Sequence, residues 1–69
     1  MTSHFLLGID TGGTYTDAVL FHETDGVIAK AKSLTTRHDL AVGIAGAVDA
    51  VIAKADIPVS AIGLVSLST

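Results

Sequence analysis

The sequence predicts an α/β fold: a mixed sheet in which three strands are followed by one crossover helix and a fourth strand. Two observations lead to this prediction. Apolar residues alternate or form short blocks up to about residue 35, and they then recur at helical spacing over residues 39–55. After Pro58 the chain returns to a short apolar segment with branched side chains. A helix of this length between two strands is typical of the connection that joins parallel strands.

The first two strands flank a glycine pair. The first is expected over Phe5–Asp10, an apolar run that ends at a Thr-Gly-Gly turn signal and that we interpret as a central strand buried on both faces. The second is expected over Tyr15–His22, where β-branched and aromatic residues are frequent. Together they predict a strand–turn–strand unit around Gly12 and Gly13.

The third strand is expected to return antiparallel to the second. Asp25 and Gly26 form a pair that is typical of hairpin turns, because glycine readily adopts the positive φ that such turns need. The strand would then occupy residues 27–35. Its two lysines, Lys30 and Lys32, lie on one face, which is typical of an edge strand.

One amphipathic helix is expected over residues 39–55. Thr36 and Asp39 have the spacing of a capping box, and Asp39 alone is the alternative cap. Gly43 and Gly46 each cost about 1 kcal/mol relative to alanine inside a helix, so we expect a close approach to a sheet there. The apolar stripe of this helix comprises Leu40, Ile44, Ala47, Val48, Val51, Ile52 and Ala55.

The fourth strand is expected over residues 61–68. Pro58 disfavours helical backbone at the residue before it, which places the end of the helix near residue 55 or 56. One helix can cover only one face of a mixed sheet, whereas such sheets are usually covered on both faces. We therefore expect residues 1–69 to be the N-terminal part of a larger domain.

Composition excludes several classes of function. The chain has 69 residues, no cysteine and a net charge of −3, and its four basic residues form no cluster. Nucleic-acid binding is not expected, because neutralising phosphates requires grouped lysines and arginines. A disulfide is impossible, and no apolar run is long enough for a membrane span. Since no basic segment precedes the first apolar run, we expect a cytoplasmic protein.

The stretch from Gly8 to Asp17 holds the residues most suited to chemistry. Gly12 and Gly13, at the tip of a strand–turn–strand, can direct several backbone N–H groups toward one anion, and the neighbouring threonines add hydroxyl donors. Asp10 would repel a phosphate unless a cation lay between them, and Mg²⁺ bound through water suits that place. A P-loop and a Rossmann loop are excluded, because a strand rather than a helix follows the glycines. The alternative is a plain tight hairpin turn in which Asp10 caps a backbone group.

The string Gly8-Ile-Asp-Thr-Gly-Gly-Thr-Tyr-Thr-Asp17 resembles the first phosphate loop of the superfamily of actin, sugar kinases and heat-shock ATPases, which have a ribonuclease H-like fold. Within that superfamily, Asp10–Asp17 is similar to the opening of the hydantoinase/5-oxoprolinase family, in which an aromatic residue and Thr-Asp follow Gly-Gly-Thr. Residues 32–36 and 65–69 are also similar to that family. The resemblance extends over essentially the whole chain.

This resemblance implies an ATP-dependent enzyme of the hydantoinase or oxoprolinase type, which uses ATP and Mg²⁺ to activate a cyclic amide for hydrolysis or carboxylation. Asp10 would orient Mg²⁺ through water, and Asp17 would support the loop. A second hydantoinase subunit is the partner that the resemblance suggests. No catalytic residue is assigned, and the chain alone is expected to be inactive, since the adenosine and substrate pockets would lie beyond Thr69. The residues assigned to the nucleotide are Thr11, Gly12, Gly13, Thr14 and Thr16, the last as a support from the second strand.

Two other interpretations stay open. One is a regulatory or chaperone-type ATPase of the same fold, which binds phosphate with the same loop and does not modify a small substrate. The other is a folding or interaction fragment without catalytic activity. An unpaired apolar strand tends to recruit another edge, so we also expect self-association through residues 61–68. The histidines lack the spacing and partners of a metal site, and His22 is expected at an exposed strand end.

Overall fold

A computed structural model describes residues 5–35 and 38–68 of the chain. Within these ranges the predicted order of strands and helix is confirmed. The strands form one mixed sheet in the order β3-β2-β1-β4, in which β2 is antiparallel to β1 and β3, and β4 is parallel to β1. The elements are β1 (Phe5–Thr11), β2 (Tyr15–His22), β3 (Gly26–Leu34), α1 (Leu40–Ala55), a 3-10 turn (Val59–Ala61) and β4 (Ile62–Ser68).

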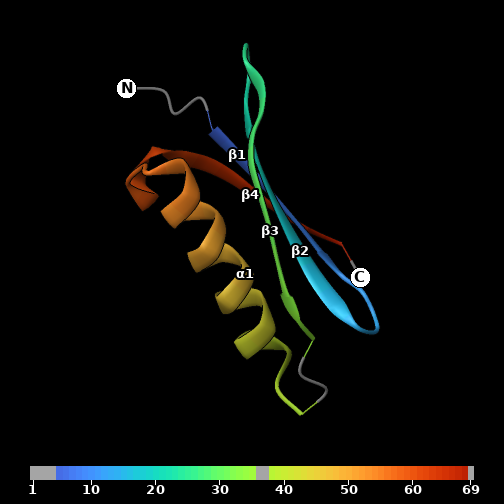
Figure 1. Cartoon of the computed structure of the whole chain (residues 1–69). Coiled ribbons are helices and arrows are strands. Elements are labelled where there is room, and N and C mark those ends of the chain that lie inside the picture. The colour runs from blue at the N-terminus through green and yellow to red at the C-terminus, as the bar shows by residue number, and fades with distance from the viewer. Residues whose placement is uncertain (1–4, 36–37, 69) are drawn as a thin grey trace.

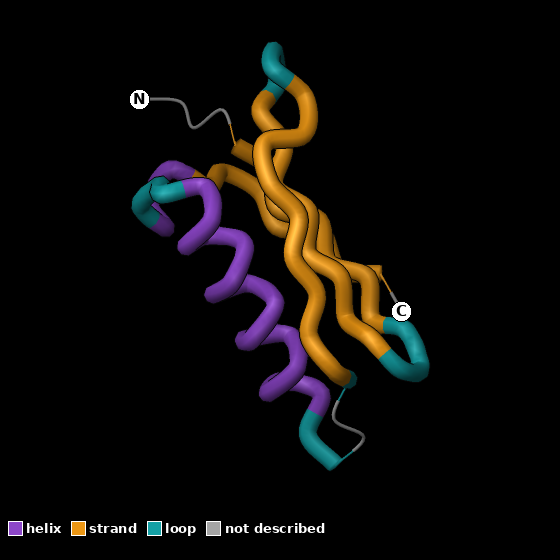
Figure 2. Tube along the Cα trace, in the orientation of Figure 1, coloured by secondary structure: helices purple, strands orange, loops and turns teal. Residues whose placement is uncertain are grey.

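The helix lies against one face of the sheet and leaves the other face open (Figure 1). It packs mainly on β3 and β2 and makes little contact with β1. The loop between β1 and β2 and the segment that leads into α1 lie at the same end of the sheet, and the β2–β3 turn lies at the opposite end (Figure 2). This arrangement places the glycine pair close to the point where the chain leaves the sheet for the helix.

Side-chain alternation along β1 and β2 builds the small core. Leu7 and Ile9 of β1 and Ala18 and Leu20 of β2 are buried, whereas Leu6, next to Leu7, is 40% exposed. This is the pattern of a half-buried sheet in which alternate residues point to opposite faces. The first strand is therefore central, as predicted, but it is buried on one face only, because the single helix covers only that face. The buried apolar residues form one cluster made up of Leu7, Ile9, Ala18, Leu20, Ala47 and Val51.

The helix begins and ends as the sequence predicts. Asp39 caps its N-terminus, since its carboxylate accepts a hydrogen bond from the Ala41 N–H at 3.2 Å. Thr36, the other member of the predicted capping box, lies outside the described residues. Asp56 ends the helix in a left-handed conformation with φ of 55°. The prediction for Leu40 was wrong: this residue is 49% exposed, because the buried stripe begins one turn later at Gly43.

Gly43 and Gly46 lie where the helix approaches β3 most closely, as predicted. A Cβ atom at Gly43 would be 3.0 Å from the Leu34 carbonyl oxygen, and one at Gly46 would be 2.9 Å from the Ser33 Oγ. Real Cβ atoms are rarely found so close to other atoms. The two glycines therefore set the short distance between α1 and the end of β3.

The sheet has two different edges. The edge strand β3 begins at Gly26, which has the expected positive φ of 80°, and it exposes Lys30 and Lys32. The other edge strand, β4, has no charged residue, and its Val65 and Leu67 are each 56% exposed. Among the described residues, no helix is long and apolar enough to cross a membrane.

Candidate functional site

The loop that joins β1 to β2 consists of Gly12, Gly13 and Thr14. The strands on either side are in register, with Thr11 opposite Thr16, and the Gly12 N–H donates to the Tyr15 carbonyl at 2.9 Å. Neither Gly12 nor Gly13 has a positive φ. Glycine is therefore not required here by a left-handed backbone, which is the usual reason for glycine in a tight hairpin turn.

The two glycines differ in what surrounds them. A Cβ at Gly12 would lie 3.0 Å from the Tyr15 carbonyl oxygen, so the hairpin itself leaves little room for a side chain at that position. A Cβ at Gly13 would meet nothing within 4 Å. Neither packing nor backbone conformation within the chain requires glycine at position 13. A bare backbone at this place allows another molecule to approach the main chain closely.

Two amide groups of the loop have no acceptor within the described part of the chain. They are the N–H groups of Gly13 and Thr14, for which no internal hydrogen bond is found there. The Gly12 N–H is occupied by the Tyr15 carbonyl, so the predicted cluster of donors is smaller than the run of residues suggests. Adjacent free N–H groups remain able to bind an anion.

The loop is held from the end of β3 by Thr35. The Thr35 hydroxyl donates to the Gly12 carbonyl at 2.9 Å, and the Thr35 N–H donates to the Thr14 carbonyl at 2.8 Å. Thr16 is 1% exposed, and its hydroxyl lies 3.1 Å from that of Thr35. The Thr16 side chain thus reaches the loop through Thr35. Sequence reasoning did not single out Thr35, because only the pairing of β2 with β3 brings it to the glycines.

Thr11 is the other predicted nucleotide residue whose side chain makes a hydrogen bond. Its hydroxyl donates to the Ser68 carbonyl at 3.3 Å, which ties the end of β4 to the end of β1 beside the loop. Thr14 is exposed at the loop tip, so its hydroxyl is open to solvent. The residues predicted to bind phosphate are therefore brought together at one end of the sheet, where Thr11 and Thr16 pair across β1 and β2 and Thr14 lies in the loop.

A row of polar residues crosses the open face of the sheet next to the loop. Asp10 pairs with Asp17 on one side and with Ser68 on the other, and Asp17 pairs with Lys32. The Lys32 Nζ lies 3.9 Å from the Asp17 Oδ1. A shallow groove of about 190 Å³ runs along this face, lined by Gly8, Ile9, Asp10, Asp17, Val19, Phe21, Ser66 and Ser68.

The chemistry of this row suits magnesium better than a transition metal. Its side-chain donors, from Asp10, Asp17, Ser66 and Ser68, are all oxygen atoms. No group of three or more His, Cys, Asp or Glu side chains that could hold a metal is found in residues 5–35 and 38–68. Mg²⁺ usually binds through one or two carboxylates, waters and substrate phosphates rather than in an all-protein cage. An exposed Asp10 on the strand that leads into the loop fits that mode of binding.

The Tyr15-Thr16-Asp17 triplet divides between the two faces of the sheet. Thr16 is buried on the helix side, whereas Tyr15 is 46% exposed. The Lys32 Nζ lies 5.1 Å from the centre of the Tyr15 ring, within cation–π range, so Tyr15 and Asp17 both contact Lys32. The two outward residues of the triplet thereby position one lysine next to the loop.

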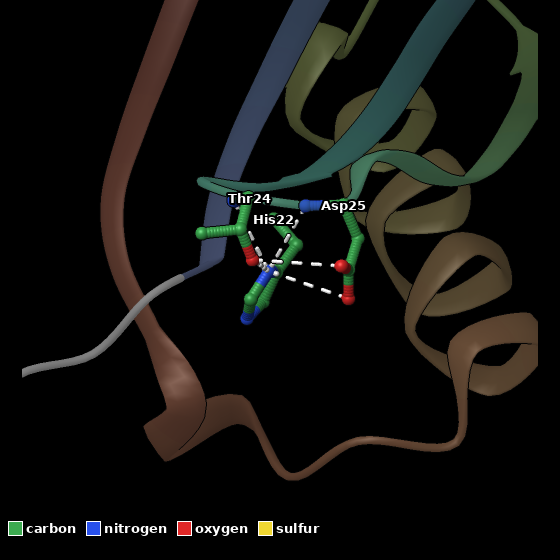
Figure 3. A network of polar contacts seen from close by, with 3 residues as sticks. All are labelled: His22, Thr24 and Asp25. Atoms are coloured by element: carbon green, nitrogen blue, oxygen red, sulfur yellow. Dashed lines mark hydrogen bonds and ion pairs between the residues drawn. The ribbon is translucent and has the colours of Figure 1, made fainter.

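His22 has a structural role in the β2–β3 turn. Its Nδ1 lies 3.0 Å from the Thr24 hydroxyl and accepts from the Thr24 N–H at 3.3 Å (Figure 3). The same atom accepts from the Asp25 N–H at 3.4 Å, and the ring packs edge-on against Phe5 with centroids 5.0 Å apart. The histidine organises the turn that lies farthest from the glycine loop. The prediction that it lies at a strand end is confirmed, since it is the last residue of β2, but these contacts leave its side chain only 22% exposed.

Comparisons with known proteins agree with the predicted fold. A family model described as the hydantoinase/oxoprolinase N-terminal region matches residues 6–69. The crystal structure of the (R)-2-hydroxyglutaryl-CoA dehydratase component A from Acidaminococcus fermentans is similar, with a TM-score of 0.80 and 20% sequence identity. The match covers 94% of this chain and only 24% of that one. This likeness shows the fold, an α/β sheet of the actin-like ATPase type. No similar sequence was found among curated proteins.

Proposed function

The chain belongs to the hydantoinase/oxoprolinase family, and we propose that it is the phosphate-binding part of an ATP-dependent enzyme that activates a cyclic amide for hydrolysis. The enzyme itself would be a longer polypeptide that contains this chain, called the full-length polypeptide below. The 24% coverage of the similar crystal structure supports this view, since most of that architecture has no counterpart in 69 residues. The chain alone would be inactive.

The observation that carries the proposal is Gly13. Its φ is not positive and a Cβ there would meet no atom of residues 5–35 and 38–68 within 4 Å, so this part of the chain has no internal need for glycine at this position. Its N–H and that of Thr14 have no acceptor among the described residues. We propose that these two groups bind the β- and γ-phosphates, with the Thr14 hydroxyl as a further donor. Gly12, Thr11 and Thr16 would shape and hold the loop.

Asp10 would hold Mg²⁺ through water. The carboxylate is exposed on the open face at the end of the central strand, next to Ser68 and Asp17. Bound there, Mg²⁺ would neutralise phosphate charge, which is a large part of catalysis in phosphoryl transfer. Asp17 would contribute less directly, because Lys32 lies 3.9 Å from its carboxylate.

The same proposal includes a substrate site, a partner and a cellular location. The cyclic amide would bind in parts of the full-length polypeptide outside this chain, and a second hydantoinase subunit would be its partner. A cytoplasmic location stays a prediction. The similar dehydratase component supports only the fold, so it does not favour one ATP-dependent reaction over another.

Replacing Asp10 in the full-length polypeptide tests the proposal. We expect Asp10→Ala to lower the ATP-dependent hydrolysis of hydantoin or 5-oxoproline by at least about 10²-fold, in the range of losing one electrostatic contact to the reacting charge. The thermal midpoint should not fall, because the side chain is exposed. Asp25→Ala, at the opposite end of the sheet, is the matched control and should leave turnover unchanged. Full activity of Asp10→Ala would refute the assignment, and ATP hydrolysis without cleavage of any cyclic amide would favour the regulatory ATPase.

A further inference from the structure

We propose that Thr35 is a positioning residue for the nucleotide loop: it fixes the peptide group that carries the Gly13 N–H so that this group faces outward. The inference rests on the proposed function, because the ligand of that N–H is taken to be a nucleotide phosphate. Thr35 is half-buried and follows the last residue of β3. It is separated from Gly12 by 23 positions in the sequence.

Thr35 holds the loop at two points. Its hydroxyl donates to the Gly12 carbonyl at 2.9 Å, and its backbone N–H donates to the Thr14 carbonyl at 2.8 Å. The two carbonyls lie on either side of Gly13. One residue of β3 thus anchors both ends of the segment whose middle carries the free amide, and only the first of these anchors depends on the Thr35 side chain.

The hydroxyl anchor determines the direction of the Gly13 N–H. The Gly12 carbonyl and the Gly13 N–H belong to one planar peptide group, and no cis peptide bond is present among the described residues. In a trans peptide the C=O and the N–H point in opposite directions. Drawing the carbonyl toward Thr35 therefore turns the N–H away from Thr35, and it also keeps a partly negative oxygen away from an incoming phosphate. Without this bond two consecutive glycines would rotate readily, because each has a permissive backbone.

The hydrogen-bond chain extends inward to Thr16. Because the Thr35 hydroxyl has one proton and gives it to Gly12, its oxygen accepts from the Thr16 hydroxyl, which lies 3.1 Å away. Thr16 is 1% exposed, so this order of donors is shielded from water. Helix α1 packs against this pair of threonines at Gly43: a Cβ there would be 3.5 Å from the Thr16 Oγ1 and 3.5 Å from the Thr35 Cα. The direction of the loop amide is thereby set from the interior.

Three variants of the chain test the role of Thr35. Thr35→Val keeps the shape of the side chain and removes the hydroxyl, Thr35→Ser keeps the hydroxyl, and Thr24→Val removes a hydroxyl from the β2–β3 turn at the opposite end of the sheet. MgADP affinity is measured in the full-length polypeptide that carries each substitution, and the thermal midpoint and the amide signals are measured on the ¹⁵N-glycine-labelled chain of residues 1–69. With this selective label only the seven glycines of the chain give amide signals, and Gly12 and Gly13 are among them.

We expect Thr35→Val to weaken MgADP binding by about tenfold or more, the size of a lost charge-assisted hydrogen bond. Without nucleotide, the amide signals of Gly12 and Gly13 in this variant should shift or broaden, and the Gly12 amide hydrogen should exchange with solvent faster than in the wild type. The signal of Gly26 should stay unchanged. Thr35→Ser should restore both properties. Thr24→Val should lower the thermal midpoint without loss of affinity. If Thr35→Val has no folded state, Thr16→Val takes its place, because it removes the hydroxyl that donates to Thr35.

Unchanged affinity and unchanged glycine signals in folded Thr35→Val would overturn the inference. Equal loss of affinity in Thr24→Val would do so as well, since the effect would then reflect stability alone. Failure of the proposed function gives a different result. In that case the wild-type full-length polypeptide binds no MgADP, while the glycine signals of the nucleotide-free variants still decide whether Thr35 orients the loop.

Discussion

Replacing Gly13 with alanine separates a structural glycine from a functional one. The added Cβ would meet no atom within 4 Å, and the backbone at this position does not have a positive φ. Alanine should therefore fit the free chain without strain. Because alanine also restricts the unfolded chain, the free energy of unfolding should stay the same or rise by up to about 1 kcal/mol.

The same substitution should weaken nucleotide binding. The new methyl group would occupy the open space beside the Gly13 N–H, which is the space that a phosphate needs. Loss of one hydrogen bond to a charged group costs about 1.5–3 kcal/mol, which corresponds to a decrease in MgADP affinity of about 10- to 100-fold. In Gly13→Ala, MgADP affinity would thus fall while the free energy of unfolding stays the same or rises.

Isothermal titration with MgADP and chemical denaturation measure the two effects on the same sample. Gly12→Ala is the matched control, since its Cβ would lie 3.0 Å from the Tyr15 carbonyl oxygen and should lower stability as well as affinity. Gly13→Ala with wild-type affinity would refute the reasoning, and so would a Gly13→Ala chain that is as destabilised as Gly12→Ala.

Two further predictions concern stability and association. Asp39→Ala removes the carboxylate that accepts from the Ala41 N–H at 3.2 Å, and it should lower the free energy of unfolding by about 1 kcal/mol, as measured by denaturant unfolding; an unchanged value would mean that this cap does not contribute. The isolated chain should self-associate through the uncharged edge strand β4, and Val65→Lys, at a residue 56% exposed on that strand, should shift it toward monomer in sedimentation experiments. A wild-type chain that stays monomeric at high concentration would contradict this.

Most of the fold could be predicted from the sequence because local signals and long-range packing agree. Gly26 needed a positive φ and has one, Asp39 caps the helix, and Gly43 and Gly46 lie at the close contact with β3. Leu40 was placed wrongly because helical periodicity does not reveal where the partner surface of a helix ends. The 3-10 turn at Val59–Ala61 was not predicted, since three residues give no periodic signal.

The candidate site could be predicted only in part. The Gly12-Gly13 motif indicated where an anion could bind, but a motif does not show which N–H groups the hairpin uses itself. The Gly12 N–H donates to the Tyr15 carbonyl, a bond that exists only in the folded hairpin. Thr35 could not be found from local sequence, because its contact with Gly12 depends on the register of β2 with β3. Such non-local pairings are the least accessible part of a site.

The most direct measurement of the central claim is an NMR titration of the ¹⁵N-labelled chain with MgADP, with adenosine as the control ligand. If the free loop amides bind phosphate, the signals of Gly13 and Thr14 will move in a saturable way with MgADP and will stay in place with adenosine, while that of Gly26 moves with neither. Signals of Gly13 and Thr14 that do not move, or that move no more than those at the far turn, would contradict the claim.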